Sequence, residues 1–329
     1  MIRYTSGLVV ILAVLLAAER IIGRRQQRLR THQSTIVQIV PPRIEPRIVD
    51  IHFGGRQWRY VYHQGAWRYP AYHDAFADPA RLEGLLRALR GCSGTPADGA
   101  DEHGLADDRR VDVILRDVQG RAMVAVQVGD AVPGTGGREC YMRFADEDQV
   151  YHVHTNPRLP LGHPLRPLVD LRVLPAGLGL GPATAVTILP ADGMPQLRLE
   201  QVFTGTPSPA GPPQRIWRLV TDTREEDGVD ASVRAYVAYL RRLAFTRLQH
   251  PARFEVAEKP RMLILTDHTG RQDTLEVGAR ASDQDTWIRL RTTGHSGTIT
   301  QAQAELLFPS AQALLDTAHT PARYQRLGE

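Results

Sequence analysis

Two histidines alternate along one short segment, and imidazoles at that spacing could begin a metal site. His152 and His154 occur in the run VYHVHTN, so on a β-strand both project from the same face, and His163 lies nearby. A metal site needs at least a third ligand and groups that orient the imidazoles. No Cys, Asp or Glu follows at a ligand spacing. The sequence therefore favours a solvated strand face, and we expect no metal and no cofactor.

The two cysteines, Cys92 and Cys140, are a candidate disulfide pair. In an oxidising compartment they would form a bridge if their Cα atoms lie within about 7 Å of each other. Two separate, partly buried thiols are the alternative, and the sequence leaves both open. A count of two cysteines excludes a disulfide-dense scaffold and a four-cysteine zinc site.

Other residues with chemical potential fit structural roles better than catalytic ones. The glycine-rich segments at 134–137 and 177–181 resemble phosphate loops, but the only lysine of the chain, Lys259, is not in a P-loop. The acidic run at 225–227 precedes an expected helix, where negative charge favours the helix dipole. Ser296 in GHSG departs from the five-residue nucleophile elbow. We therefore expect no catalytic residues and no enzyme activity.

Two amphipathic helices are expected, one opening at Asp78-Pro79 and one capped by Asp230. Their apolar residues recur at the i, i+3, i+4, i+7 spacing of one helix face. These residues are Leu82, Leu85, Leu86 and Leu89 in the first helix and Val233, Tyr236, Val237 and Leu240 in the second. Such a stripe predicts a helix that packs on a partner surface, here a twisted sheet.

The body of the chain repeats itself at an offset of 150 residues. AWRY, which contains Trp67, corresponds to IWRL, which contains Trp217, and ILRD at 114–117 corresponds to ILTD at 264–267. Each of the last two segments leads through a glycine turn into a further strand. The two tryptophans are expected in the core because they recur at equivalent places.

These correspondences predict two copies of one module made of a sheet and a helix. Repeat one spans residues 47–180 and repeat two spans residues 181–329. The expected fold class is therefore α+β, with two tandem modules after a single N-terminal transmembrane helix. Prolines within residues 26–46 predict a stiff, extended linker before repeat one.

The N-terminus carries an apolar run that could cross a membrane. Residues 7–18 are uncharged, and residues 4–23 reach the roughly 20 residues of a span if the flanking charges lie at the interface. Those membrane-interface residues are Glu19, Arg20, Arg24 and Arg25. A cleaved secretory signal and a buried helix are the alternatives, but leucine stands where signal cleavage needs a small residue. We expect an uncleaved, single-pass anchor over residues 1–25.

The composition excludes several classes of protein. Hydrophobic residues make up 42% of the chain and charged residues 23%, which excludes wholesale disorder and fibrous repeats. The formal net charge is only +4, from 40 basic and 36 acidic residues that mix along most of the chain. A strong nucleic-acid binder needs its basic residues concentrated on one face, so we expect no nucleic-acid partner.

In its order of elements the chain resembles a bacterial membrane-anchored family known as domain of unknown function forty-three-forty. In repeat one the resemblance rests on Trp67, Asp78, the leucine helix, Gly104-Leu105, Gly129, the strand at 141–143 and the strand at 150–153. Repeat two keeps Trp217, a helix and Gly278, but 254–256 (FEV) stands in place of the Gly-Leu turn. The resemblance extends over about residues 47–320.

This resemblance implies a duplicated module, often encoded beside genes for gliding-motility-type ABC transporters. It favours modules in the periplasm, whereas the arginines after the apolar run favour the cytoplasm under the positive-inside rule. The expected location is the bacterial inner membrane with periplasmic modules. The expected partners are an integral membrane protein and, through residues 4–23, the lipid bilayer.

The expected function is that of a non-enzymatic, membrane-anchored accessory or scaffolding subunit. The larger complex would be of a transporter type, or an energy-converting or light-harvesting assembly. The alternative is a periplasmic ligand- or glycan-binding module that uses the cleft between the repeats. An enzyme ranks third, either a hydrolase or a protein with a metal site at His152 and His154.

Overall fold

The computed structural model describes residues 37–38, 40–41, 43–97, 103–106, 108–162, 164–190, 196–204, 214–227, 229–316 and 324. The expected anchor at 1–25, with Glu19, Arg20, Arg24 and Arg25, lies outside the described residues, as do most of the linker and His163. Contact clustering divides the chain into two compact units. The first unit comprises residues 1–59 and 80–167, and the second comprises residues 60–79 and 168–329.

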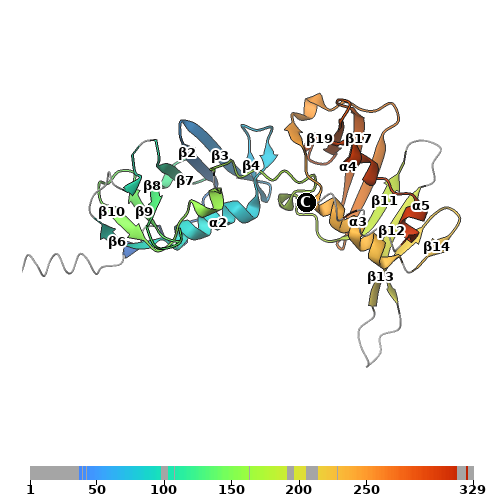
Figure 1. Cartoon of the computed structure of the whole chain (residues 1–329), viewed down its shortest axis with the longest axis horizontal. Helices are drawn as coiled ribbons and strands as arrows, with labels where there is room; N and C mark the ends of the chain where they lie inside the picture. The colour runs from blue at the N-terminus through green and yellow to red at the C-terminus, as the bar shows by residue number, and fades with distance from the viewer. Residues whose placement is uncertain are drawn as a thin grey trace, which may run out of the picture. The chain divides into compact units, whose positions relative to one another are not determined.

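The first sheet has the strand order β1-β6-β10-β9-β8-β7-β2-β3-β4-β5 (Figure 1). Its strands are β1 (Val37–Gln38), β2 (Ile48–Phe53), β3 (Arg56–His63), β4 (Ala66–Tyr69), β5 (Ala75–Phe76), β6 (Ser93–Ala97), β7 (Val111–Arg116), β8 (Ala122–Ala131), β9 (Cys140–Phe144) and β10 (Val150–Val153). Neighbouring strands such as β7 and β8 pair antiparallel. The α-helix α2 (Pro79–Arg90) follows β5 in the chain.

The second sheet has the order β14-β13-β12-β11-β16-β17-β18-β19-β15. Its strands are β11 (Ala183–Leu189), β12 (Leu197–Thr204), β13 (Gln214–Val220), β14 (Glu225–Glu226), β15 (Arg247–Gln249), β16 (Arg261–Asp267), β17 (Gln272–Arg280), β18 (Asp285–Leu290) and β19 (Ser296–Thr300). Three α-helices accompany this sheet: α3 (Asp230–Arg242), α4 (Gln301–Leu306) and α5 (Ala311–Leu315). Short 3₁₀ helices lie at η2 (Leu159–Leu161), η3 (Ala176–Leu178) and η4 (Pro251–Arg253).

Nine strands of each sheet follow one common order. Read from β6, the first sheet runs β6-β10-β9-β8-β7-β2-β3-β4-β5, and the second, read from β15, runs β15-β19-β18-β17-β16-β11-β12-β13-β14. The helices α2 and α3 occupy the same place in chain order, after β5 and after β14. Two copies of one module would have this shared topology. The duplication itself stays a prediction, and the common order supports it.

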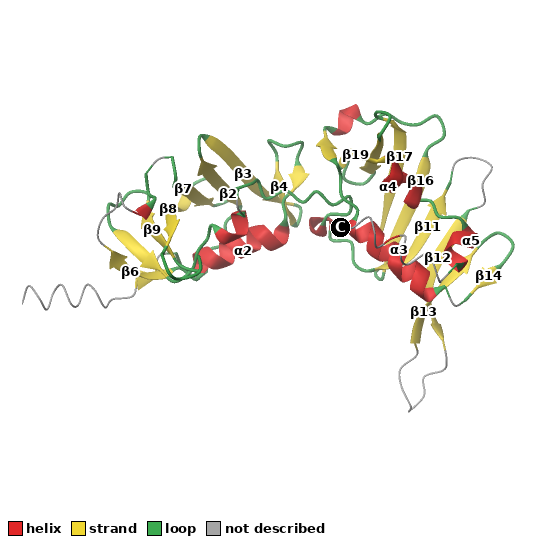
Figure 2. Ribbon diagram, viewed as in Figure 1, coloured by secondary structure: helices red, strands yellow, loops and turns green. Residues whose placement is uncertain are grey.

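The expected α+β class is wrong, whereas the transmembrane helix expected before it lies outside the described residues. The described residues are mainly antiparallel β-sheet, with ten and nine strands in the two sheets (Figure 2). The two expected amphipathic helices are present as α2 and α3. Each accompanies a sheet of many short strands, and helical periodicity gives no sign of those strands. Among the described residues, no helix is both long enough and apolar enough to span a membrane.

The two expected helices bury the faces that their spacing indicates. The leucines of α2, namely Leu82, Leu85, Leu86 and Leu89, are all buried. In α3, Val233, Tyr236 and Leu240 are buried and Val237 is half-buried against the same core. Asp230 was expected to be the N-cap of α3. It is instead the first helical residue, and Val229 is the N-cap. The Asp230 carboxylate accepts a hydrogen bond from the backbone N–H of Trp217 at 3.2 Å, which ties α3 to β13.

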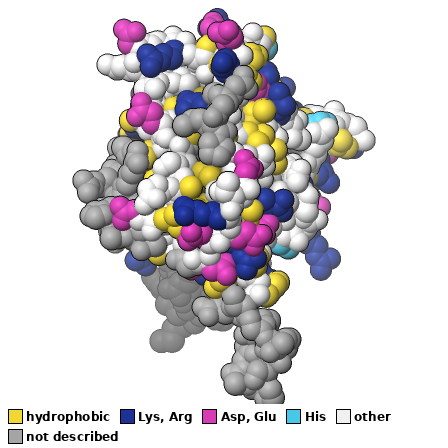
Figure 3. All heavy atoms as spheres, turned by 90° about the vertical axis from the view of Figure 1, so that its right-hand side faces the viewer, with side chains coloured by type: hydrophobic (Ala, Val, Ile, Leu, Met, Phe, Trp, Pro, Cys, Tyr) yellow, Lys and Arg dark blue, Asp and Glu magenta, His cyan; other side chains and the backbone are white. Residues whose placement is uncertain are grey.

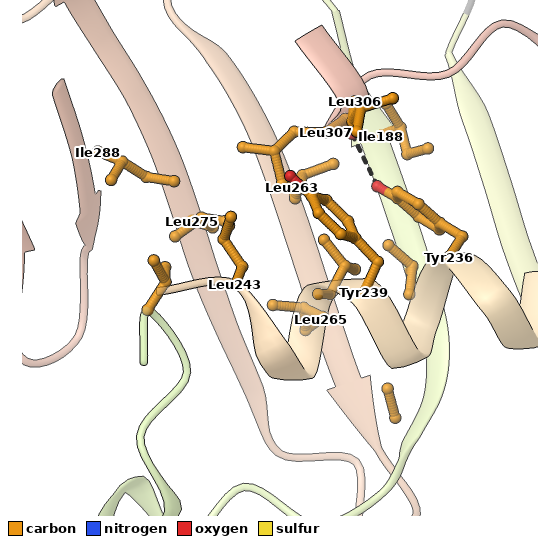
Figure 4. Packing of buried hydrophobic residues seen from close by; sticks show 14 of the residues in the cluster. Ile188, Tyr236, Tyr239, Leu243, Leu263, Leu265, Leu275, Ile288, Leu306 and Leu307 are labelled. Atoms are coloured by element: carbon orange, nitrogen blue, oxygen red, sulfur yellow. Dashed lines mark hydrogen bonds between the residues drawn. The ribbon is translucent and has the colours of Figure 1, made fainter. Parts of the chain in front are cut away.

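The core of the second unit lies between the sheet and the helices. Figure 4 shows Tyr236 and Tyr239 pointing from α3 toward the leucines of β16 and the end of α4. The hydroxyl of Tyr236 donates a hydrogen bond to the carbonyl of Leu307 at 2.7 Å, and that of Tyr239 donates to Gln303 at 3.0 Å. These bonds satisfy two buried hydroxyls inside an apolar cluster, which would otherwise carry a desolvation cost.

The two tryptophans differ in burial. Trp217 is only 2% exposed and belongs to the core of the second unit. Trp67 is half-buried and packs edge-on against Tyr62, with the ring centroids 5.3 Å apart. The expectation of a core position therefore describes Trp217 better than Trp67.

Two glycines meet the same kind of contact in the two sheets. A Cβ added at Gly129 would lie 2.2 Å from the carbonyl oxygen of His103, and one at Gly278 would lie 2.2 Å from that of Glu255. Each glycine also lies close beneath an apolar side chain, Leu105 in the first case and Phe254 in the second. The segment around Phe254 thus supports its strand as the Gly-Leu turn does, although the sequences differ.

Candidate functional site

An apolar pocket of about 810 Å³ opens in the second unit. Ile188 near the end of β11 and Leu197 at the start of β12 line it, together with the segment 221–224 after β13 and the segment 308–311 between α4 and α5. On the face drawn in Figure 3, apolar side chains are exposed among charged side chains of both signs. The volume lies within the range of small-molecule sites.

Arg261, the first residue of β16, places a cation in the wall of this pocket. Its side chain is half-buried, and its guanidinium carbon lies 4.5 Å from the centroid of the Phe308 ring. Burial lowers the pKa of this guanidinium, and the charge of Glu305 partly opposes the shift. Within the described part of the chain, no carboxylate forms an ion pair with Arg261. The guanidinium therefore remains able to bind an anionic group.

The strand register explains why Arg261 lies at the pocket. Side chains alternate along a strand, so Arg261 shares a face with the buried Leu263 and Leu265. At the offset of 150, the corresponding residue of β7 is Val111, which is 0% exposed. An arginine thus occupies a core-facing position that the first sheet fills with valine. A half-buried arginine at a core-facing strand position is informative because arginine side chains are mostly exposed.

This arrangement can hold an apolar body with one anionic group. The apolar walls would bury the hydrocarbon part of a ligand at about 25 cal/mol per Å². The planar guanidinium matches the two oxygens of a carboxylate or phosphate in a bidentate pair. Sequence reasoning missed Arg261, and the signal that could have found it is the mismatch with Val111 in the repeat.

A second cavity in the same unit, of about 370 Å³, is lined by polar side chains that include Arg68, His73, His250 and His295. The His295 ring is 6% exposed and lies edge-on to Phe76 and Phe245, at 5.2 and 5.0 Å between centroids. Burial lowers the pKa of His295 to about 4. Burial therefore keeps the His295 imidazole neutral at neutral pH. Its Nε2 has no hydrogen-bond partner among the described residues.

The other candidates from the sequence take structural roles. Ser296 is buried and donates its hydroxyl to the carbonyl of Gln249 at 3.1 Å, which links β19 to β15. In the acidic run, Glu225 and Asp227 both pair with Arg218, at 3.1 and 2.8 Å. The three glycines within 134–137 lie in a turn, and all three have positive φ.

The two cysteines are both buried, and the structure has them as thiols rather than as a disulfide. The Sγ atom of Cys92 lies 3.2 Å from the hydroxyl of Thr155, and that of Cys140 donates to the carbonyl of the same threonine at 3.3 Å. Burial raises the pKa of Cys92 to about 11 and also raises the pKa of Cys140. Both groups are therefore protonated at neutral pH, when they are poor nucleophiles and poor metal ligands.

The structure brings His152 and His154 together with a carboxylate that sequence reasoning missed. Glu139, directly before β9, lies with both imidazoles in one cluster whose ligand atoms are within 4.8 Å of one another. Glu139 precedes the histidines by more than ten residues, so only the register of β9 and β10 reveals the contact. A hairpin prediction for these two strands is the signal that could have found it.

The described residues thus define a β-sheet protein with an arginine-bearing apolar pocket. Residues 67–174 match the family model described as Domain of unknown function (DUF4340). The match includes every residue of repeat one on which the resemblance rests, and it confirms the expected family for this part of the chain. Membership of repeat two and the transporter-gene context stay predictions. Neither a curated protein nor a solved structure matches the chain.

Proposed function

We propose that the chain is a non-enzymatic binding protein whose second unit takes an amphiphilic carboxylate, with a hydrocarbon body and one anionic end. The observation that carries this proposal is the half-buried Arg261 in the wall of a mostly apolar pocket of about 810 Å³. This refines the expected alternative of a ligand-binding module and places the ligand within one unit.

The half-buried arginine selects the charge of the ligand, and the volume selects its size. A guanidinium that has lost part of its water binds an anion more strongly than an exposed one does. A neutral ligand would gain nothing from the positive charge of Arg261, and a cationic ligand would be repelled by it. The free energy that separates carboxylate from alcohol is about 1.5–3 kcal/mol, a factor of about ten to a hundred.

Displacement of a dansyl-labelled undecanoic acid from the full-length chain tests this proposal. We expect dodecanoate to displace the probe at least about tenfold better than dodecanol, and dodecylammonium to be the weakest. Thr223→Trp, at the exposed rim of the pocket, should lower the affinity for the probe. Thr292→Trp, exposed elsewhere in the same unit, should leave that affinity unchanged. Equal displacement by the acid and the alcohol would contradict the proposal.

A second function, that of an accessory subunit in a larger membrane protein complex, is favoured by the hairpin of β12 and β13. β11 pairs with β12 only over Leu197 to Glu200, whereas β13 pairs with β12 as far as Thr204. On this two-stranded extension Phe203 is 63% exposed, and the guanidinium of Arg215 lies 5.1 Å from its ring centroid. A two-stranded ribbon is marginally stable alone, so an exposed aromatic on it favours a partner surface.

Gentle detergent extraction followed by identification of co-purifying membrane subunits tests this second function. Phe203→Ser should release a partner that the unaltered chain retains. Val118→Ser is the matched control, because Val118 is 75% exposed in a turn of the first unit. Retention of the same subunits by Phe203→Ser would exclude the hairpin as the contact.

A further inference from the structure

We propose that Glu139, His152 and His154 form a site for a divalent transition-metal ion, with zinc as the ion that best suits the ligands. The Nε2 atom of His152 lies 2.5 Å from one carboxylate oxygen of Glu139, and the Nδ1 atom of His154 lies 3.9 Å from the other. Two imidazoles and one carboxylate are the protein ligands of one class of zinc site, which keeps a fourth position for water.

The register of two strands places these ligands on one face. His152 is opposite Tyr141 and Val153 is opposite Cys140, so His154 comes opposite Glu139 at the end of the ladder. Because side chains alternate, all the ligands project away from the buried face of β9 and β10. That opposite face carries core residues, namely Cys140, Met142 and Val153.

The distances fit an ion with only small side-chain movements. Ligand atoms around a tetrahedral zinc ion lie about 3.3 Å apart, as follows from metal–ligand distances near 2.0–2.1 Å. The two distances to Glu139, 2.5 and 3.9 Å, lie on either side of that value. The side chains are 31%, 48% and 30% exposed for His152, His154 and Glu139, so an ion can enter from solvent.

An ion pair between Glu139 and His152 accounts for only part of the cluster. It does not explain why a second imidazole faces the same carboxylate, with the two imidazole centroids 5.6 Å apart. A metal ion instead binds both rings in their neutral form, and the carboxylate balances part of its charge.

Contacts around the cluster restrict the positions of the ligands. The ring of His103 stacks on Tyr141 at 3.8 Å between centroids, and Tyr141 lies 5.9 Å from the ring of His152. The carbonyl of Glu139 accepts a backbone hydrogen bond from Val132 at 2.9 Å, which closes the loop before β9. Such supporting contacts orient metal ligands and raise affinity.

The second sheet shows what the same positions do without the histidines. The register of β18 and β19 puts Thr298 opposite Trp287 and Thr300 opposite Asp285, so an acid remains and the imidazoles become threonines. Thr300 caps α4, and Thr298 shares a hydrogen bond with Thr246 at 2.9 Å. These hydroxyls are engaged in structure, so the proposed metal site belongs to the first unit alone.

Titration calorimetry of the chelator-treated, full-length chain with ZnCl₂ tests the proposal. We expect one equivalent of zinc to bind near neutral pH, and His152→Gln or His154→Gln to weaken it by at least about tenfold. His63→Gln, which alters an exposed histidine outside the cluster, is the matched control and should bind as the unaltered chain does. Equal zinc affinity in the unaltered chain and in the variant that carries both His152→Gln and His154→Gln would overturn the proposal.

A spectroscopic measurement keeps the test independent of any change in folding. With Cu²⁺ as the probe, electron paramagnetic resonance should show hyperfine coupling to two imidazole nitrogens in the unaltered chain. Each single histidine variant should show coupling to one. A spectrum without nitrogen coupling in the unaltered chain would overturn the assignment of His152 and His154 as ligands.

Discussion

Arg261 of the second sheet stands at the strand position that Val111 occupies in the first sheet. Val111 pairs with Val128 on β8, and Arg261 pairs with Val277 on β17, so the two registers agree. The valine is fully buried, whereas the arginine lines an apolar pocket. One position of a shared topology therefore serves packing in one sheet and, in our proposal, ligand binding in the other.

The opposite asymmetry occurs at β9 and β10, where the first sheet carries the imidazoles and the second carries threonines. Each sheet thus has polar side chains, proposed here to bind a ligand or a metal ion, at positions where the other sheet has residues with a purely structural role. This division is what we expect of two modules that share a fold but bind different partners.

Truncation of Leu85 to alanine should destabilise the first unit by about 2–5 kcal/mol. Leu85 is 0% exposed on the core-facing stripe of α2, so the smaller side chain would leave a cavity. The shift of the urea midpoint measures this loss. Leu159→Ala is the control, because Leu159 is 59% exposed and its loss should change the unfolding free energy by less than about 0.5 kcal/mol. Similar shifts for both variants would contradict the helix assignment.

The carboxylate of Glu276 should contribute more to stability than an amide does at the same place. It is 1% exposed and accepts hydrogen bonds from Arg289 and Arg291, at 3.0 Å each. Glu276→Ala would leave two guanidinium groups without an acceptor, and we expect a loss of about 2–3 kcal/mol in chemical denaturation.

The first sheet supplies the matched control for Glu276. There the corresponding residue is Gln127, whose amide oxygen accepts from Arg143 at 2.6 Å. Glu276→Gln should therefore fold and lose only about 1 kcal/mol. A loss for the glutamine variant as large as that for alanine would show that the amide cannot replace the acid here.

Acidification should destabilise the second unit through His295. Its pKa is lowered from 6.5 to about 4, chiefly by burial and in smaller part by the charge of Arg68, while a backbone hydrogen bond with Arg172 and the charge of Asp170 oppose the shift. Between about pH 4 and 6.5 the unfolded chain binds a proton that the folded chain does not, so stability rises with pH in this window. Above about pH 6.5 the folded state carries no such penalty. Below about pH 4 the penalty reaches about 3 kcal/mol of unfolding free energy.

Unfolding free energies measured across this pH window in the unaltered chain and in His295→Phe check the prediction. The variant keeps the aromatic contacts with Phe76 and Phe245 but cannot titrate, so its stability should fall less toward acid. His63→Gln, an exposed histidine, should follow the unaltered chain. Parallel curves for His295→Phe and the unaltered chain would refute the role of His295.

The sequence predicted the parts of the fold that depend on local periodicity. The spacing of apolar residues located α2 and α3, because an amphipathic stripe arises within one continuous segment. The class was wrong because short strands are stabilised by pairing with distant segments, and their number is not visible in any one of them. The residues of repeat one also sufficed to identify the family over 67–174.

The site residues show the same division. His152 and His154 were candidates because they alternate within one short segment, although the sequence favoured a solvated strand face, whereas Glu139 joins them only through strand register. Arg261 lies three residues before the repeated segment 264–267, and its residue type alone does not distinguish it from the many other arginines of the chain. Its importance appears only when its burial is compared with that of Val111.

Replacement of Arg261 by valine, the residue of the first sheet, tests the central proposal most directly. Calorimetry should give a ratio of dodecanoate to dodecanol affinity of at least about ten for the unaltered chain and of about one for Arg261→Val. The variant should remain folded and be as stable or up to about 1 kcal/mol more stable, because valine suits a core-facing strand position. Arg253→Gln, which removes one exposed positive charge outside the pocket, should keep the high ratio. A ratio that stays at or above about ten in Arg261→Val would contradict the account.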